Sequence, residues 1–357
     1  MKIIHCSDLH LDSPMSSNLS AAKALERNAE LCAAFGRLVA YAVREQVTAV
    51  LIAGDLFDSP NASRRTVDYV LEKISSAAQV QFFYLRGNHD GDRDAFSGCK
   101  IPENLKCFGD FWKSYPCGSV LITGMELGWE KPEACFDDLN LPADACNIVM
   151  LHGEIAAQPG PEQIPLPSLR NRNIDYLALG HIHSFRQGKL DDRGIFCYSG
   201  CLEGRGFDEC GEKGFVLLET RESGIRSTFV PFNTRTLHEI PVDITGLETA
   251  PQMLSAMERA SAGIGEENLV KFVLTGSNTL QIHKDLRFLQ KMMEPNFWFV
   301  KIKDESHLKL DRESYEGDIS LKGEFIRLVL ASQHSDEEKE RIISCGIRAL
   351  MGEEVYL

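Results

Sequence analysis

The sequence lacks three features that would each point to a particular class of protein: a long hydrophobic run, an export signal and paired cysteines. Its apolar stretches, such as residues 47–53, are far shorter than the roughly 20 residues that a membrane-spanning helix needs. Asp8 and His10 stand where a secretory signal would have its apolar core. We therefore expect a protein of the cytoplasm that does not associate with a membrane.

Cysteines are present, but not in a pattern that binds metal or builds a disulfide framework. The chain has eleven cysteines, an odd number scattered over 357 residues, and none of them forms a C-x-x-C pair. Cys197 and Cys201 come nearest to that spacing. In a chain without an export signal this pattern indicates reduced, buried thiols, and it argues against zinc held by cysteine.

Basic residues are in the minority. The chain has 38 lysines and arginines against 52 aspartates and glutamates, a net charge of −14, and the acidic excess lies on both sides of residue 230. Net charge therefore gives no general attraction to nucleic acid, so such a partner would need a local positive site. A hydrophobic content of 43% is ordinary for a globular protein, and 357 residues fit two domains or one large domain with an appendage.

The first part of the chain alternates short apolar runs with longer helical patterns, which is typical of a layered α/β domain. Residues 20–46 and 63–78 have the periodicity of amphipathic helices, and Ser20 is a suitable N-cap. Strands are predicted at residues 2–6, 49–53, 81–85, 120–123, 147–151, 176–179, 195–198, 214–219 and 226–231.

The pattern changes after Pro231. Strand-like and helix-like segments then alternate over residues 236–303, and two helical patterns follow at residues 320–331 and 336–351. We predict three parts: an α/β domain, a smaller α+β domain and a C-terminal helical segment, at residues 1–232, 233–305 and 306–357.

Polar residues that can bind metal follow five of the predicted strands. S-D-L-H follows the first strand, A-G-D-L-F-D the second and R-G-N-H-D the third, while M-L-H-G-E and L-G-H-I-H-S follow later strands. The carboxyl ends of strands in an α/β sheet share one edge, where loops on a rigid base hold functional groups. A glycine adjoins four of these groups, which permits close backbone approach. The side chains concerned are Asp8, His10, Asp55, Asn88, His89, His152, His181 and His183.

This set of donors suits a pair of divalent ions. Carboxylate, imidazole and amide ligands without a thiolate favour manganese, iron or zinc over copper. If Asp8 and Asp55 are the only carboxylates bound, two ions leave a local charge of about +2, which suits a phosphate even in an acidic protein. Such a pair can clamp the attacking and leaving oxygens of an in-line displacement and generate hydroxide near neutral pH. We expect hydrolysis of a phosphoester by metal-bound hydroxide, without a covalent intermediate on the protein.

The order D-x-H, G-D, G-N-H-D, H and G-H-x-H resembles the calcineurin-like metallophosphoesterase family over roughly residues 1–215. D-L-H-L-D-S-P near the start and Y-S-G-C-L-E-G-R-G-F-D-E-C-G-E-K-G-F at residues 198–215 resemble its SbcD branch of DNA repair nucleases, in particular the YhaO-like members. H-E-I-P-V-D-I-T-G and V-K-F-V-L-T-G, within residues 231–276, resemble the capping domain of that branch. The resemblance implies a four-layer α/β fold, a two-layered β-sandwich flanked by helices, whereas periodicity alone leaves a doubly wound sheet open.

The resemblance also implies a role for each residue of the motifs. His89 would not be a ligand but would orient the phosphate and protonate the leaving oxygen, a role worth about 10²–10⁴ in rate. Asp90 and Asp58 would at most support a ring or a loop. Arg205 and Arg86 are candidates for contacting the substrate, because arginine suits bidentate phosphate contacts. The implied metal ligands are Asp8, His10 and His183 for a first ion, Asn88, His152 and His181 for a second, and Asp55 for both.

The function implied is that of a metal-dependent phosphodiester hydrolase. The resemblance points to a DNA exonuclease or endonuclease subunit in DNA repair, using manganese in preference to iron or zinc and working with an SbcC-type coiled-coil ATPase. Homodimer formation is common in the family, although nothing in this chain indicates it. Two alternatives remain open: a hydrolase of small phosphoesters, such as cyclic nucleotides or phosphomonoesters, which suits the acidic composition, and a non-catalytic scaffold that binds a partner.

Overall fold

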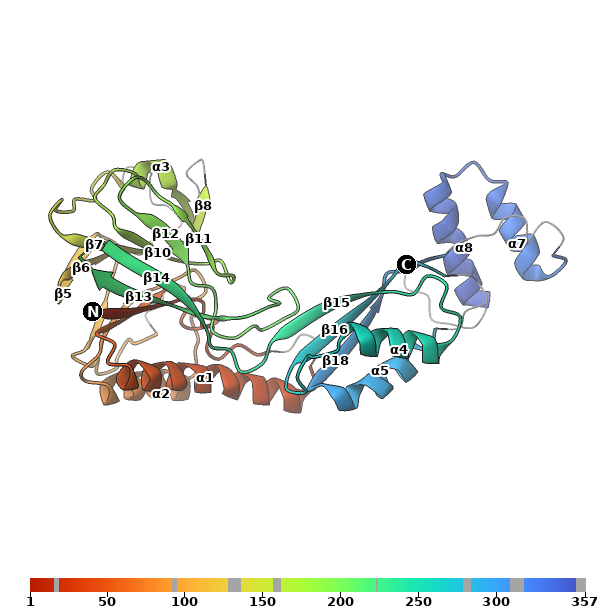
Figure 1. Cartoon of the computed structure of the whole chain (residues 1–357), viewed down its shortest axis with the longest axis horizontal. Coiled ribbons are helices and arrows are strands. Elements are labelled where there is room, and N and C mark those ends of the chain that lie inside the picture. Colours follow the sequence, from red (N-terminus) through yellow and green to blue (C-terminus); the bar gives the residue numbers. More distant parts are fainter. Residues whose placement is uncertain are drawn as a thin grey trace. The chain divides into compact units, whose positions relative to one another are not determined.

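The computed structural model describes residues 1–15, 19–91, 95–127, 136–156, 162–222, 224–278, 284–308 and 318–350. The chain divides into two compact units, Met1–Thr236 and Leu237–Leu357 (Figure 1). This division falls close to the boundary predicted after residue 232, and the further separation of residues 306–357 as a domain stays a prediction. Among the described residues, no helix combines the length and the apolar character needed to cross a bilayer.

The first unit contains two six-stranded sheets. Most pairs of neighbouring strands near the centre of each sheet are parallel, and antiparallel strands lie towards the edges. The first sheet has the order β14-β13-β1-β2-β3-β4, with β1 Lys2–Cys6, β2 Ala49–Ala53, β3 Gln81–Leu85, β4 Leu105–Cys107, β13 Gly214–Arg221 and β14 Gly224–Pro231. The second has the order β11-β12-β10-β7-β6-β5, with β5 Lys113–Cys117, β6 Val120–Gly124, β7 Cys146–His152, β10 Tyr176–Gly180, β11 Arg186–Lys189 and β12 Ile195–Tyr198.

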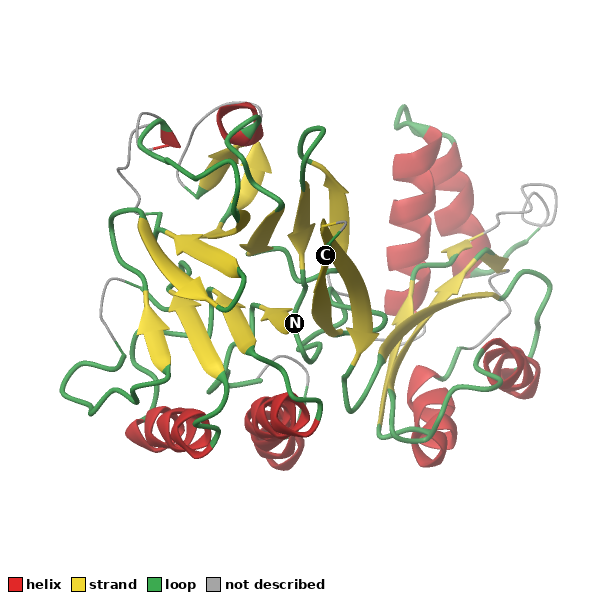
Figure 2. Ribbon diagram, turned by 60° about the vertical axis from the view of Figure 1, so that its left-hand side comes forward, coloured by secondary structure: helices red, strands yellow, loops and turns green. Residues whose placement is uncertain are grey.

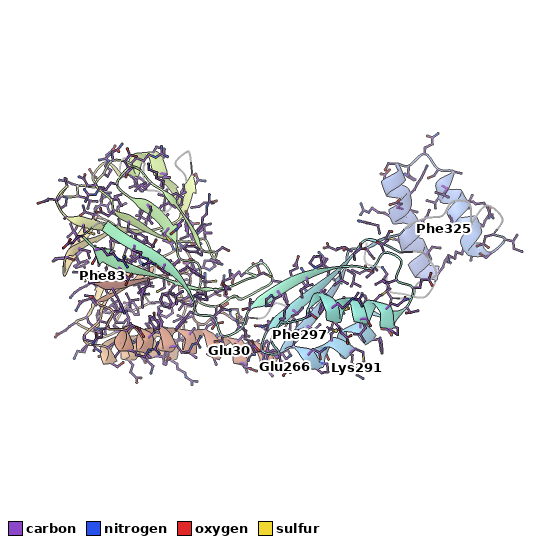
Figure 3. All side chains as sticks on the ribbon, in the orientation of Figure 1. Glu30, Phe83, Glu266, Lys291, Phe297 and Phe325 are labelled. Carbon is purple, nitrogen blue, oxygen red and sulfur yellow. The ribbon has the colours of Figure 1, made fainter. Side chains whose placement is uncertain are left out.

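The two sheets pack face to face around a shared apolar core. Leu51 and Phe83 of the first sheet lie in one buried cluster with Met150 and Ala178 of the second, and Phe83 is labelled in Figure 3. Helices α1 (Ala21–Arg44) and α2 (Arg64–Ser76) lie side by side on the outer face of the first sheet (Figures 1 and 2). Loop side chains and the short α3 (Leu166–Leu169) cover the outer face of the second sheet. The predicted sandwich is therefore confirmed, and a single doubly wound sheet is excluded.

Local sequence explains most of these elements. The side chains of Ser20 and Ser63 accept hydrogen bonds from the backbone at the starts of α1 and α2, as N-caps do. Strand β2 is buried along its whole length because helices cover one of its faces and the second sheet covers the other, and its sequence is accordingly the continuous apolar run AVLIA. All nine strands predicted in this unit are confirmed to within a few residues. The prediction missed the short or largely exposed β4, β5, β11 and the small pair β8 (Glu154–Ala156) and β9 (Gln163–Pro165).

The second unit contains a three-stranded parallel sheet in the order β15-β16-β18. Helices α4 and α5 pack on one face of this sheet, around a core that includes Phe272 and Phe297 (Figure 3). Helices α7 and α8 pack against each other through a separate small cluster that includes Ile326 and Ile343. The helix predicted to residue 351 is described to Leu350, and residue 351 lies outside the described residues. The bounds are β15 Leu237–Asp243, α4 Ala250–Ala260, β16 Leu269–Thr275, β17 Ser277–Asn278, α5 Leu286–Met293, η2 Glu294–Asn296, β18 Phe299–Asp304, β19 His307–Leu308, α7 Leu321–Leu330 and α8 Asp336–Leu350.

Candidate metal centre

All seven predicted metal ligands lie at the carboxyl ends of strands and come together across the two sheets. Strands β1, β2 and β3 of the first sheet and β7 and β10 of the second supply them. His152 is the last residue of β7, and the other six follow their strands by two or three residues or directly. Three overlapping groups of acidic and histidine side chains have donor atoms within 4.8 Å of one another: Asp8 with His10 and His183, Asp8 with Asp55 and His152, and His10 with Asp58 and His89.

The backbone at the strand ends is held in an uncommon conformation. Asp8, His10, Asp55 and His181 have φ angles of 53°, 44°, 50° and 95°, in a region that costs a residue with a side chain about 1–3 kcal/mol. Hydrogen bonds between the loops stabilise this conformation: Asp8 N donates to Gly54 O and His10 N to Asp55 O, both at 3.0 Å. The loops after β1 and β2 are therefore joined by their main chains, and strain of this kind is typical of functional sites.

Two glycines allow the loops to approach each other so closely. A Cβ atom on Gly87 would lie 2.2 Å from Asp55 Oδ1, and one on Gly180 would lie 1.9 Å from Ala53 O. Neither distance is tolerable, so any larger residue at these positions would push the strand ends apart. The glycines noted beside the sequence motifs thus have a packing reason at the site itself.

The first predicted set of ligands brings two imidazole nitrogens face to face. His10 Nε2 and His183 Nε2 are 3.2 Å apart, and His183 Nε2 is 3.9 Å from Asp8 Oδ1. The Nδ1 atoms have other partners, since His183 Nδ1 lies 2.6 Å from Glu209 Oε1 and His10 Nδ1 lies 3.1 Å from Asp58 Oδ1. A proton on each Nδ1 leaves two Nε2 lone pairs directed at each other. A cation between them satisfies both.

The second predicted set has the same character. Asn88 Oδ1 lies 3.0 Å from His152 Nε2 and 3.3 Å from His181 Nδ1. His152 Nδ1 lies 2.9 Å from the carbonyl oxygen of Ala53, to which it can donate, so its Nε2 is the atom directed at the site. Two nitrogen acceptors thus surround an amide oxygen.

Asp55 lies between the two sets. Its Oδ2 is 3.4 Å from His152 Nε2 and 3.7 Å from His10 Nε2, while its Oδ1 accepts a hydrogen bond from His89 N at 2.8 Å. This geometry suits the bridging position that the resemblance implies. The carboxylate, imidazole and amide donors fit two divalent ions of the manganese, iron or zinc type, with no thiolate among them.

Ionisation in the metal-free protein reflects the same crowding. Burial opposes ionisation of Asp55, but the neighbouring His152 and His10 outweigh burial and lower the pKa of Asp55. Burial likewise disfavours a charged His152, but Asp55 beside it raises the pKa of His152 to about 9. A proton on His152 therefore takes part of the place of a cation in the metal-free state.

Asp90 supports the loops rather than the ions. It is buried, and its carboxyl oxygens accept hydrogen bonds from the backbone nitrogens of Leu56, Phe57 and Gly87 at 3.3, 2.8 and 2.9 Å. Burial, reinforced by the charge of Asp55, raises the pKa of Asp90 to about 7. Its contacts join the loop after β2 to the loop after β3, in keeping with the supporting role that was predicted.

His89 is the most open of the histidines around the centre, with 43% of its side chain exposed. Its ring meets that of His10 edge to face, with centroids 4.7 Å apart. Its Nδ1 lies 3.2 Å from the carbonyl oxygen of Asp58, to which it can donate, so Nε2 is left for a substrate. The geometry places His89 beside the predicted metal positions and outside both ligand sets.

The two arginines predicted to touch substrate are both engaged by carboxylates. Arg86 donates to Glu126 through Nε at 2.9 Å and through Nη2 at 2.6 Å, and through Nη1 to Gly91 O at 3.3 Å. Arg205 donates to Asp58 and to Glu209. These contacts supply a structural reason for both residues, while contact with substrate stays a prediction.

Sequence reasoning missed Glu209 and Glu126. Glu209 lies in the glycine-rich block at residues 198–215, but nothing in its local pattern shows that it reaches His183. Glu126 follows β6 and is buried against Arg86. The signal that could have found Glu209 is an acidic residue in the same loop block as Arg205, four positions along.

Residues 1–185, just over half of the chain, match the sequence profile of the calcineurin-like phosphoesterases. The chain belongs to this family. Calcineurin-like phosphoesterases are hydrolases that use divalent metals, and the clusters described above are where this member could hold them.

Individual phosphoesterases of this family are similar over most of the chain. The uncharacterized metallophosphoesterase YhaO of Bacillus subtilis is 25% identical over 305 residues, which cover 78% of this chain and 72% of that protein. The DNA double-strand break repair protein Mre11 of Sulfurisphaera tokodaii is 24% identical over 340 residues, covering 87% and 84%. A subunit of the nuclease SbcCD of Staphylococcus epidermidis is 22% identical over 282 residues, covering 68% and 72%.

Proposed function

We propose that this protein is a two-metal phosphodiesterase that cleaves DNA as the nuclease subunit of a repair complex. The observation that carries the proposal is the convergence of seven oxygen and nitrogen donors on one buried centre, with the exposed His89 beside it. The names of the Mre11 and SbcCD relatives support the choice of DNA over other phosphodiesters. Manganese is the proposed metal, because the donor set mixes carboxylate and imidazole.

The chain's own residues prepare the site for a phosphodiester. Two divalent ions, when bound, polarise phosphoryl oxygens and lower the pKa of a water molecule. Asp8 and Asp55 offset only part of the charge of such ions, so the centre attracts a phosphate despite the net charge of −14. Asp55 would hold both ions at a fixed separation, since its Oδ2 faces both histidine sets.

His89 is the proposed general acid. Its Nδ1 is held by the carbonyl oxygen of Asp58, and its main-chain nitrogen is held by Asp55 Oδ1, so both ring and backbone are oriented. The remaining Nε2 can carry a proton to the leaving oxygen of the scissile bond. A group that touches substrate in this way contributes about 10²–10⁴ to the rate.

The proposed partner is a coiled-coil ATPase of the SbcC type. The staphylococcal relative is named as a subunit, which supports an assembly, and an ATPase partner is what the sequence resemblance implies. The described cysteines are all free thiols, which supports the proposal of a reducing compartment such as the cytoplasm. Homodimer formation is a further proposal on the ground of the same resemblance.

The test compares two substrates on manganese-loaded protein. Linear duplex and single-stranded DNA should be cleaved, with and without the ATPase partner, and His89→Ala should reduce the rate strongly without loss of bound metal. Hydrolysis of a nitrophenyl phosphodiester serves as the reference for the chemistry alone. DNA left intact while the small diester is hydrolysed would reject DNA as the substrate but leave the hydrolase.

A small phosphoester is the second candidate substrate. The net charge of −14 disfavours a long polyanion, and a hollow of about 220 Å³ lined by Ser13, Met15, Arg205 and Asp208 adjoins the site. A mononucleotide-sized ligand would fit such a hollow better than duplex DNA does. Competition between a cyclic nucleotide and DNA for the same enzyme would separate the two candidates.

A further inference from the structure

The guanidinium group of Arg205 lies between two carboxylates that contact different histidines. Its Nη1 donates to Asp58 Oδ1 at 2.6 Å, and its Nε and Nη2 donate to Glu209 Oε1 at 3.3 and 3.1 Å. We infer that Arg205 is a positioning residue, a brace between Asp58 and Glu209. Through these carboxylates it fixes the Nδ1 atoms of His10 and His183 and directs both Nε2 atoms at the first metal position. This inference rests on the proposed two-metal site, not on the proposed substrate.

Each carboxylate of the brace contacts the outward nitrogen of one ring. Asp58 Oδ1 is 3.1 Å from His10 Nδ1, and Glu209 Oε1 is 2.6 Å from His183 Nδ1. A carboxylate at Nδ1 fixes the tautomer and the ring orientation and makes the other nitrogen a better ligand. The 3.2 Å separation of the two Nε2 atoms is therefore set from outside the metal position.

An arginine is needed because one group must contact both carboxylates at once. Asp58 and Glu209 are anions held close to the carboxylates of the centre, and without a cation between them they would repel each other. The planar guanidinium presents donors in several fixed directions, whereas lysine offers a single point charge on a flexible stem. Arg205 is only 19% exposed, and its three donating nitrogens are already committed to carboxylates. We therefore replace its predicted phosphate contact with this positioning role.

The main chain that carries Arg205 is itself anchored. Arg205 N donates to Glu209 Oε2 at 2.7 Å, and the carbonyl oxygen of Gly204 accepts from the buried Arg27 of α1 at 2.7 Å. The side chain of the buried Glu203 accepts from Thr234 N and Thr234 Oγ1, both at 2.7 Å. The brace thus starts from a fixed loop, which limits the number of directions its guanidinium can take.

The second metal position is built differently. His152 Nδ1 contacts the backbone carbonyl of Ala53, and His181 directs its Nδ1 towards Asn88 in the centre. Neither contact involves the brace. Loss of the brace should therefore weaken the first position selectively.

The experiment titrates metal-free protein with manganese chloride by calorimetry. In an Asn88→Ala background, which leaves the first position, Arg205→Lys should weaken manganese binding about 10–100-fold. In a His10→Ala background, which leaves the second position, the same change should alter the dissociation constant less than twofold. Arg193→Lys is the matched control, because Arg193 also grips a carboxylate, Asp175, through Nε at 3.0 Å and Nη2 at 2.9 Å. It lies at the opposite ends of the strands and should change neither constant.

A cycle of double mutants guards against a merely unfolded variant. Asp58→Asn and Glu209→Gln should each weaken the first position, and each should reduce the additional effect of Arg205→Lys. Strict additivity, equal weakening of both positions, or no change at either would overturn the brace. Wild-type protein that binds no manganese would overturn both the brace and the proposed function. Intact DNA together with the selective weakening would reject the substrate and leave the brace standing.

Discussion

The two ends of the strands in the first unit both contain buried polar side chains, but they satisfy those side chains in different ways. At the amino ends, Asn104 Nδ2 lies within 2.8–3.1 Å of the carbonyl oxygens of Ile74, Ala77 and Val80. This amide has acceptors for its hydrogens within the protein. Such a group stabilises the loop around it and has no need of a ligand.

At the carboxyl ends, acceptors face acceptors. His10 Nε2 lies opposite His183 Nε2, and His152 Nε2 lies near both Asn88 Oδ1 and Asp55 Oδ2. The backbone there also has the positive φ angles that the amino ends of these strands do not require. The comparison teaches that one set of strands carries a stabilising end and a binding end, and that unsatisfied electron pairs distinguish them. Changes at the two ends should therefore separate stability from activity.

The largest effect is expected from Asp55→Asn. Loss of the charge shared by both metal positions should abolish binding of at least one ion and reduce hydrolysis to the background of the assay. Metal content after dialysis and hydrolysis of a nitrophenyl phosphodiester measure the two effects. Asp192→Asn, on an exposed turn, is the control. A variant that keeps two bound ions and full activity would show that the carboxyl ends are not the binding end.

His89→Ala should lower kcat by about 10²–10⁴ while leaving the amount of bound manganese unchanged. The reason is that His89 lies beside the centre but outside both ligand sets. His238→Ala, on β15, is the matched control for loss of a histidine. Loss of a metal ion from the His89 variant would instead make His89 a ligand and contradict the proposed division of roles.

Asn104→Ala should lower the free energy of unfolding by about 1–3 kcal/mol, because buried carbonyl groups lose their donor. Manganese affinity and kcat should remain within twofold of wild type. Urea denaturation of the metal-free protein measures the first quantity. Lys106→Ala, which removes a neighbouring exposed side chain, should change stability by no more than about 0.5 kcal/mol. An activity loss as large as that of the His89 variant would break the comparison between the two ends.

The smallest effect concerns pH. In the metal-free protein Asp55 raises the pKa of His152 from 6.5 to about 9 in spite of burial, so His152 is protonated at neutral pH. Binding at Nε2 displaces that proton, so manganese affinity should fall about tenfold per unit as the pH is lowered below 9. The same raised pKa contributes stability to the metal-free protein below pH 6.5, and that contribution is lost as the pH rises through 9. Calorimetry in buffers of different ionisation enthalpy should detect about one proton released, and its absence would contradict the assignment.

Much of the first unit could be predicted from the sequence because its signals are local. The run AVLIA is buried on both faces, and Ser20 caps α1 where the start of the helical periodicity places it. The seven donors were found because each directly follows such a strand. The short strand β11 was missed because its sequence, RQGK, is exposed and carries no apolar alternation.

The supporting contacts could not be predicted in the same way. Asp58 lies 147 positions from Arg205, and His183 lies 26 positions from Glu209, and all four belong to loops without regular periodicity. Arginine and carboxylate side chains in loops are most often solvated, so nothing local distinguishes this bridge from a surface charge. The assignment of Arg205 to substrate followed from its residue type alone.

The sequence by itself determined which segments form strands and helices and which donor atoms end each strand, because apolar periodicity, capping serines and glycines act over a few neighbouring residues. Only the tertiary structure decided that the strands form two stacked sheets and that donors from both sheets share one centre. That outcome depends on pairings such as Lys2 with Glu219, between residues far apart in the chain, and on the burial of both sheet faces against each other. Long-range packing of this kind leaves no local pattern from which it could be read.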